Sequence, residues 1–186
     1  MAIATVRPAA AADIDEIVRI QATVWRTAYA DLVPAEALDR LVGPAARQAW
    51  AAALNAGPGY HVLVAGEGAW TVGFCAAACY TGEGGVLAEI NTLLVEPRWG
   101  RRGHGGRLLA AAAAHLRADG AQRGHAWVPE TDLVAQRFYA RAGWEPDGAA
   151  RTLDTGDGPL REVRLAGTLD LRLAGEAEPP RASLGG

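Results

Sequence analysis

The chain lacks the features that mark several common classes of protein. It has two cysteines among 186 residues, and no basic start followed by an apolar core, the pattern of a secretory signal, occurs near its N-terminus. Its longest apolar run, residues 108–114, is far shorter than the roughly 20 residues that a membrane-spanning helix needs. We therefore expect a soluble, cytoplasmic protein with no membrane partner.

The few cysteines and histidines predict free thiols and no metal. Cys75 and Cys79 lie four positions apart on an expected strand. Their side chains then point to the same face but lie too far apart along the strand to form a disulfide. The four histidines have no spacing typical of a metal site. We expect no bound metal.

The charge of the chain gives no sign of a nucleic-acid surface. The formal net charge is −3, and 50% of the residues are hydrophobic. These values are typical of a soluble domain with a substantial core, and we expect no nucleic-acid partner. We expect a single domain over residues 1–170. Residues 171–186 are rich in Gly, Glu, Pro and Ser, and we expect them to be disordered.

The order of the expected elements predicts a mixed α/β fold. Stretches of helical periodicity alternate with short β-rich runs that end at glycine or proline. The expected strands cover residues 3–7, 60–65, 70–80, 86–95, 124–128, 144–149 and 161–169. The expected helices cover residues 14–28, 105–118 and 132–143, with two shorter ones that begin at positions 34 and 44.

The most informative stretch is residues 90–109, where a β-rich run ends at Pro97 and a basic glycine cluster leads into an apolar helix. A helix N-terminus carries unpaired N–H groups and a partial positive charge, which together attract phosphate. Glycine lets phosphate oxygens approach the backbone because it has no Cβ. The residues expected at a phosphate are Arg101, Arg102, Gly103, His104, Gly105, Gly106 and Arg107, of which His104 contributes its backbone.

The glycine cluster does not have the pattern of a common nucleotide-binding loop. No Lys-Ser or Lys-Thr follows the glycines, which excludes the G-x-x-x-x-G-K-S/T loop of nucleotide triphosphatases. The spacing G-x-G-x-x-G of dinucleotide-binding folds is also absent. Taken alone, the cluster is compatible with a loop that merely starts a helix.

Two segments in this order resemble the GCN5-related N-acetyltransferase (GNAT) family. The first, Val95-Glu96-Pro97 with the loop of residues 100–105, resembles the family's strand ending V-x-P and its loop Q/R-x-x-G-x-G/A. Gly100 replaces the usual Gln or Arg. The second, residues 132–145, resembles N-x-x-A-x-x-F-Y-x-x-x-G-F/W, with Asp132 in place of Asn. The resemblance covers roughly residues 4–169.

The resemblance implies a fold and a cosubstrate. In GNAT proteins a mixed, mostly antiparallel central sheet, flanked by helices, holds two parallel strands that splay apart. The thioester arm of acetyl-CoA fills the gap and pairs with the backbone of the first strand, here Leu93, Leu94 and Val95. The side chains of these three residues are expected to be mostly core. The glycine loop holds the pyrophosphate, and Asp132 occupies the position of a further CoA contact.

The resemblance also implies catalytic residues. Glu89 is the expected general base, and a pKa raised by partial burial would suit this role. Strand alternation places it on the same face as Asn91 and Leu93. Tyr139 is the expected general acid, which donates a proton to the departing sulfur. The alternatives are a solvent-facing or arginine-paired carboxylate at Glu89 and a tyrosine packed in the core.

Aromatic residues of the first helical region suggest an acceptor site. Trp25, Tyr29 and Asp31 lie in the string W-x-x-A-Y-x-x-L-x-P, which resembles a GNAT subgroup with small-molecule or uncharacterised acceptors. Aromatic walls can hold an amine by cation–π contact, and Asp31 can attract its charge. Packing of the same residues in the core is equally compatible with their spacing.

These observations predict an acetyl-CoA-dependent N-acetyltransferase that acts on a primary amine of a small molecule. We expect direct attack in a ternary complex, without an acyl-cysteine intermediate, in a monomer or homodimer. Two alternatives stay open. One is a protein N-terminal or lysine acetyltransferase, and the other is a catalytically silent acyl-CoA-binding module.

Overall fold

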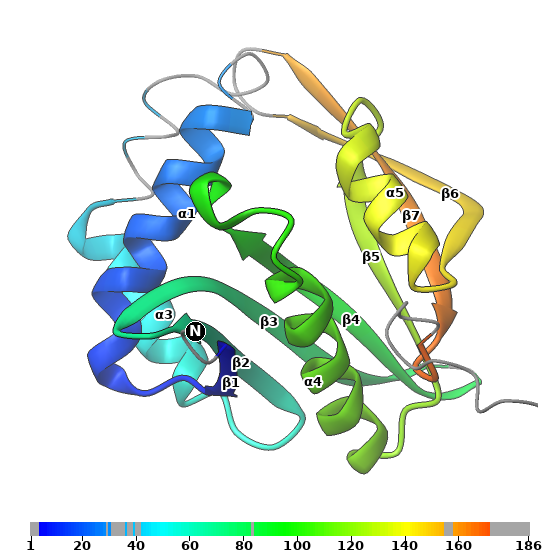
Figure 1. Cartoon of the computed structure of the whole chain (residues 1–186). Helices are drawn as coiled ribbons and strands as arrows, with labels where there is room; N and C mark the ends of the chain where they lie inside the picture. Colours follow the sequence, from blue (N-terminus) through cyan, green and yellow to red (C-terminus); the bar gives the residue numbers. More distant parts are fainter. Residues whose placement is uncertain are drawn as a thin grey trace, which may run out of the picture.

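A seven-stranded sheet with the strand order β1-β2-β3-β4-β5-β7-β6 forms the centre of the molecule (Figure 1). The computed structural model describes residues 4–28, 42–82, 84–154 and 158–171 and the single positions 30, 36 and 39. The strands are β1 (Ala4–Pro8), β2 (Tyr60–Glu67), β3 (Trp70–Gly82), β4 (Gly85–Val95), β5 (Arg123–Pro129), β6 (Glu145–Asp154) and β7 (Pro159–Thr168). The helices are α1 (Ile14–Ala28), α3 (Pro44–Leu54), α4 (His104–Ala118) and α5 (Leu133–Arg141), with short 3-10 turns at Ala11–Asp13 and Pro97–Trp99.

Strand direction confirms the predicted fold class. Neighbouring strands in the described part of the chain run antiparallel, except for β4 and β5, which run parallel. The expected elements occur in the expected order, apart from the helix predicted from position 34, which lies largely outside the described residues. The tail from position 172 onward also lies outside them. No helix of the described residues is long and apolar enough to cross a membrane.

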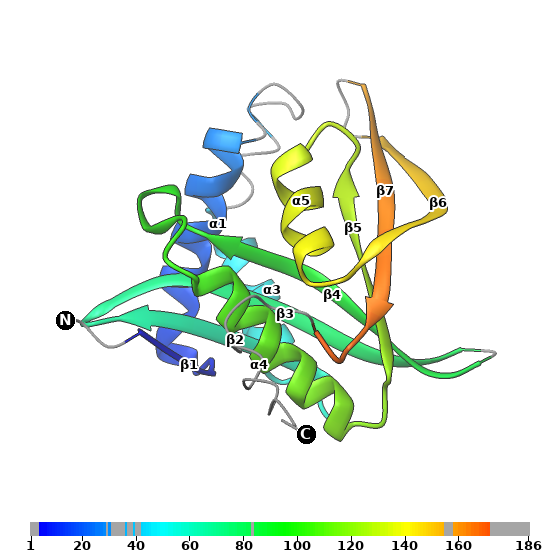
Figure 2. The ribbon, with the colours of Figure 1, turned by 45° about the vertical axis from the view of Figure 1, so that its right-hand side comes forward.

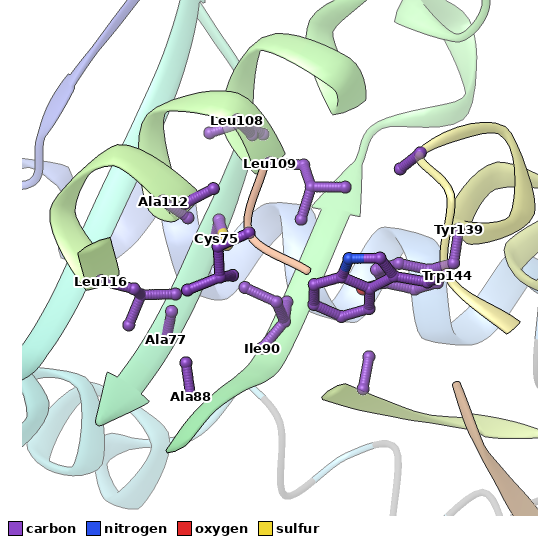
Figure 3. Packing of buried hydrophobic residues seen from close by; sticks show 14 of the residues in the cluster. Cys75, Ala77, Ala88, Ile90, Leu108, Leu109, Ala112, Leu116, Tyr139 and Trp144 are labelled. Atoms are coloured by element: carbon purple, nitrogen blue, oxygen red, sulfur yellow. The ribbon is translucent and has the colours of Figure 1, made fainter. Parts of the chain in front are cut away.

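Helices cover both faces of the sheet (Figure 2). On one face, the apolar stripe of α1, with Ile17, Ile20 and Val24, packs with Phe74 of β3, and α3 adds Trp50. On the other face, α4 and α5 pack over a larger core that includes the side chains in Figure 3. The sheet therefore has an α1 face and an α4 face, and each strand alternates between them.

A β-bulge in β4 changes this alternation. Ala76 of β3 pairs with Thr92 and Ala77 pairs with Ile90, so Asn91 has no partner on β3. Before the bulge, Ile90 faces the α4 core, whereas after it Leu93 does. An extra residue shifts the side-chain parity by one. The expectation that Glu89 and Leu93 share a face is therefore wrong.

Trp144, at the end of α5, is fully buried between β5, β7 and the helix. Its ring leaves no room for a side chain at Gly167, since a Cβ there would lie 2.4 Å from Trp144 Cδ1. Its indole nitrogen donates to the backbone oxygen of Thr168 at 2.9 Å. Trp144 thus fixes the position of the C-terminal end of α5 on the sheet.

We expect Gly167→Ala to lower the free energy of unfolding by about 1–3 kcal/mol, the usual cost of overpacking a filled core. Urea denaturation should show a lower midpoint with an unchanged slope. Gly84→Ala is the matched control, because a Cβ at Gly84 meets no atom within 4 Å. Equal midpoints for the two variants would contradict the packing described for Trp144.

Candidate active site

The two parallel strands pair only over their first halves. The register of β4 and β5 runs from Leu87 opposite Arg123 to Ile90 opposite Ala126. Beyond this point β4 pairs with β3 alone and β5 with β7 alone, and the two strand ends diverge below α5 (Figure 2). One edge of each strand therefore has no strand partner there among the described residues. The splay expected between the strands before and after the glycine loop is present.

A cleft of about 130 Å³ opens at this divergence. Both strands contribute to it, together with α1, α5 and β7. Its lining consists of Trp25, Ile90, Asn91, Thr92, Leu93, Leu94, Trp127, Val128, Pro129, Ala135, Tyr139, Leu160 and Glu162.

The cleft is lined from both faces of the sheet. Leu93, Ala135 and Tyr139 belong to the α4 face, where they pack with the core under α4 and α5. Val128 also faces that core, so its strand neighbour Trp127 points to the α1 face. By the same alternation, Glu162 on β7 points to the α1 face. A group held on one side of the sheet can thus meet a group held on the other side.

The glycine loop joins the end of β4 to α4. Gly103 precedes the helix with a φ of 81°, a left-handed conformation that favours glycine. The helix starts at His104, one residue earlier than the sequence predicts. The first backbone hydrogen bond of the helix runs from the N–H of Arg107 to the oxygen of Gly103, at 3.0 Å. The N–H groups of His104, Gly105 and Gly106 therefore have no acceptor within the helix. These amides lie where the sequence predicts an anion site, and the binding of an anion to them stays a prediction.

Gly105 has a packing role as well. A Cβ at this position would lie 3.2 Å from Phe138 Cε2 of α5 and 3.7 Å from Leu93 Cδ2 of β4. The absence of a side chain therefore lets α5 approach the N-terminus of α4. This contact brings the second sequence segment against the first.

Glu67, at the end of β2, braces the glycine loop. Its Oε1 accepts from Arg102 Nη1 at 3.0 Å, and its Oε2 lies 2.7 Å from His104 Nε2. The hydrogen bond to His104, and after it the one to Arg102, lowers the pKa of the Glu67 carboxyl. The His104 ring is buried, so its backbone is the part of this residue that can face a ligand at the start of α4. Sequence reasoning missed Glu67, which lies 35 residues before Arg102.

The loop arginines differ in how they are held. Arg98 pairs with Glu96 at 2.8 Å, and Arg102 lies 4.8 Å from the centre of the Trp99 ring. Arg107 donates through Nη1 to the backbone oxygen of Arg102 at 2.9 Å. Arg101 is exposed, has a left-handed backbone, and makes no ion pair with a described residue. Arg101 is thus the cation of the loop with the greatest freedom to reach a ligand.

Glu89 lies on the α1 face of β4, next to the cleft-lining residues Ile90 and Asn91. Its Oε2 is 3.5 Å from His125 Nε2, and His125 Nδ1 is 3.4 Å from the Tyr80 hydroxyl. The hydrogen bond with His125 lowers the pKa of the Glu89 carboxyl, and this effect outweighs the opposing effect of burial. The expectation that burial raises the pKa of Glu89, as would suit a general base, is therefore wrong.

Tyr139 lies in the wall of the cleft on the α4 face and is 5% exposed. Its ring stacks on Trp144, with ring centres 5.4 Å apart and an angle of 16° between the planes (Figure 3). The ring is thus part of the core and also borders the cleft. Both readings of this tyrosine, core and functional, are compatible with its position.

Four other predicted site residues remain, of which the structure describes two. Asp132 caps α5, where its Oδ1 accepts from the Ala135 amide at 2.9 Å. Trp25 lines the cleft from α1. Tyr29 and Asp31, predicted beside Trp25 at the acceptor, lie outside the described residues.

Sequence reasoning did not identify Trp127 and Glu162 as site residues. Both reach the cleft only because β5 and β7 pair, with Trp127 opposite Arg164 and Pro129 opposite Glu162. The sequence offers one signal for this site, which is the carboxylate of Glu162 within an expected strand. Leu93, Leu94 and Val95 have half-buried side chains that pack against the two cores, as expected.

Both cysteines are free thiols. Burial raises the pKa of Cys75 to about 12. The pKa of Cys79 is also raised, chiefly by burial. Neither thiol forms a thiolate readily at neutral pH, and neither lines the cleft. Within the described part of the chain, no three His, Cys, Asp or Glu side chains are grouped so that they could hold a metal ion.

The match to a known protein family covers the same regions of the chain. Residues 58–146 match a family model described as an acetyltransferase (GNAT) domain. This range contains the diverging strands, the glycine loop and the segment with Tyr139. No curated protein matches the chain significantly in sequence.

Several solved structures share the fold. The PaiA N-acetyltransferase of Thermoplasma acidophilum, solved with coenzyme A, is 16% identical with a TM-score of 0.72, over 87% of this chain and 98% of that one. The protein yncA of Salmonella typhimurium, solved with its cofactor acetyl-CoA, is 23% identical with a TM-score of 0.64, over 96% of this chain and 98% of that one. A ribosomal-protein-alanine N-acetyltransferase of Brucella melitensis is 19% identical with a TM-score of 0.70, over 88% and 99%. The resemblance inferred from two sequence segments is confirmed, because residues 58–146, which contain both segments, match the GNAT acetyltransferase domain.

Proposed function

We propose that this protein is an acetyl-CoA-dependent N-acetyltransferase that acts on a primary amine of a small molecule. The observation that carries the proposal is the cleft between the diverging ends of β4 and β5, lined by residues of β4 shortly before the glycine loop. Similar folds solved with coenzyme A and with its acetyl ester support the choice of donor. The aromatic walls that Trp25 and Trp127 give the cleft support a small acceptor.

In this proposal the donor lies on the α4 face. The N–H groups of Gly105 and Gly106 at the start of α4 bind the pyrophosphate, and Arg101 adds a charge to it. The arm of the donor runs along the unpaired edge of β4 at residues 93–95, where backbone groups need partners. Its thioester then lies in the cleft beside Tyr139.

The proposed chemistry is direct transfer in a ternary complex. The amine nitrogen attacks the thioester carbonyl carbon, the C–S bond breaks, and the amine loses a proton. Glu89 accepts this proton, directly or through water, because its lowered pKa keeps the carboxylate ionised at neutral pH. Tyr139 donates its phenolic proton to the departing sulfur. The raised pKa of Cys75, together with its place outside the cleft, supports a route without an acyl-cysteine.

Calorimetric titration with acetyl-CoA and with CoA tests the donor site first. Saturable binding of both ligands is expected. A colorimetric assay for released thiol, with and without a panel of small amines, then tests transfer. Binding without amine-dependent thiol release would indicate a silent acyl-CoA-binding module, and no binding of either ligand would overturn the proposal.

The pH dependence of turnover tests whether Glu89 acts as a base that stays ionised or as one that titrates near neutral pH. Because its pKa is lowered, the carboxylate stays ionised until the pH falls below the ordinary glutamate range, and it contributes no limb to the profile near neutral pH. We expect Glu89→Gln to lower kcat by a similar factor across pH 6–8. The factor should be about tenfold, below the hundredfold typical of a well-matched base, because a carboxylate of low pKa is a weak base.

The matched control is Glu130→Gln, which removes a half-exposed carboxylate outside the cleft that pairs with Arg161 at 3.2 Å. Its kcat should equal that of the unmodified protein. If Glu89→Gln left kcat unchanged across this range, the assignment of Glu89 as the base would be wrong, whereas loss of a limb between pH 6 and 8 would contradict its lowered pKa.

A further inference from the structure

The α1 side of the cleft contains a buried carboxylate that no step above uses. Glu162 lines the cleft and is 8% exposed. Its Oε2 accepts from Arg151 Nε at 2.6 Å, which compensates the burial of the charge. Its Oε1 accepts no hydrogen bond from any residue that the structure describes. A carboxylate oxygen that borders a cleft and has no donor from the protein is a favourable place for an N–H group of a ligand.

The arginines around Glu162 are already paired with carboxylates. Arg151 is held by Glu162, and Arg164 Nε donates to Asp147 Oδ2 at 2.8 Å. Both guanidinium groups also lie over the Trp127 ring, at 4.5 Å and 5.6 Å from its centre. The charge of each arginine is therefore met by a protein carboxylate. Among the carboxylates paired with these two arginines, Glu162 lines the cleft, and its Oε1 has no donor among the described residues.

The other walls on this side are apolar or aromatic. Trp25 of α1, Trp127 of β5 and Leu160 of β7 line the same half of the cleft as Glu162. Trp127 is held by the two arginines over its ring, so it presents a fixed surface. Such walls suit a flat, apolar body and leave Glu162 as the polar contact that fixes its orientation.

We propose that Glu162 positions the acceptor amine, and that the acceptor is a primary amine on a flat apolar body without a carboxylate beside the amine. The inference rests on the transferase function proposed above. Glu162 Oε1 accepts a hydrogen bond from the amine nitrogen, while Trp25 and Trp127 enclose the body. A carboxylate next to the amine would lie against Glu162, where like charges repel.

Three ligands of similar size separate these contributions in calorimetric titrations of the protein, both alone and saturated with CoA. They are 2-phenylethylamine, its neutral analogue 2-phenylethanol, and phenylalanine. The unmodified protein should bind the amine at least about tenfold more tightly than either of the others, which corresponds to one charge-assisted hydrogen bond. Phenylalanine binding as tightly as the amine would overturn the proposed acceptor class.

Glu162→Gln distinguishes a positioning role from a structural one. The variant should lose about tenfold in affinity for 2-phenylethylamine and raise its KM in turnover by a similar factor, while its affinity for 2-phenylethanol and for acetyl-CoA stays unchanged. Equal losses for the amine and the alcohol would show that Glu162 only supports the fold, and the proposal would fall. Glu130→Gln should leave all three affinities unchanged.

The two proposals fail in different ways. If acetyl-CoA and CoA do not bind, the transferase function falls whatever the amine titrations show. If both bind but Glu162→Gln leaves the affinity for the amine unchanged, only the acceptor assignment is overturned.

Discussion

Tyr139→Phe should lower kcat by about a hundredfold, the lower range for loss of a positioned acid. The substitution removes one oxygen and keeps the ring, so the stack on Trp144 and the packing of α5 should persist. The dissociation constant of acetyl-CoA should therefore stay within about twofold, because the lost interaction acts on the departing sulfur and not on the bound donor. Steady-state kinetics together with calorimetry measure both quantities.

Tyr60→Phe is the matched control for this variant. Tyr60 is a half-buried tyrosine of β2 that packs against the core on the α1 face, and it does not line the cleft. Its loss of a hydroxyl should leave kcat unchanged. Equal kcat values for Tyr139→Phe and the unmodified protein would mean that the thiolate leaves without a proton from Tyr139, and would remove this residue from the mechanism.

Gly103→Val should weaken the binding of acetyl-CoA by about a hundredfold. A left-handed backbone costs an L-residue about 1–2 kcal/mol, and loss of a charge-assisted hydrogen bond to a phosphate costs about 1.5–3 kcal/mol more. Together they amount to about 2.5–5 kcal/mol, a range that contains the roughly 2.8 kcal/mol of a hundredfold change. The φ of Gly103 is 81°, and a Cβ there would lie 3.0 Å from Arg107 Nη1. Calorimetric titration measures the loss.

Gly43→Val gives the matched control for the glycine loop. Gly43 also precedes a helix, α3, but it has an extended backbone with a φ of −75°, and a Cβ there meets no atom within 4 Å. Its acetyl-CoA affinity should equal that of the unmodified protein. If Gly103→Val bound acetyl-CoA with unchanged affinity while remaining folded, the start of α4 would not be the pyrophosphate site.

The sequence was sufficient to predict local structure, since local rules determine it. The apolar stripe on α1 and the short β-rich runs that end at glycine or proline each depend on a few neighbouring residues. The splay of the two parallel strands followed from the resemblance, which also linked the glycine loop to the segment of Tyr139. These two segments meet where Phe138 packs over Gly105.

The remaining features depend on register and on contacts between distant segments. The bulge at Asn91 shifts the parity of β4, and no pattern in the strand itself signals it. Glu67 reaches the glycine loop from β2, and Glu162 reaches the cleft from β7, because of how strands pair in the sheet. The lowered pKa of Glu89 likewise depends on His125 of the neighbouring strand. Such juxtapositions follow from the assembled sheet and not from spacing along the chain.

The splay of β4 and β5 also bears on how the protein behaves in storage and during purification. Two adjacent strand ends expose backbone groups that lack a strand partner in the described structure. An open strand edge is a template for pairing with another chain, which is a common origin of aggregation. A donor whose amide-containing arm lies along residues 93–95 would cover this edge. Colloidal stability should therefore increase with cosubstrate occupancy, so that CoA acts as a solubilising additive for a protein whose own sheet is left open.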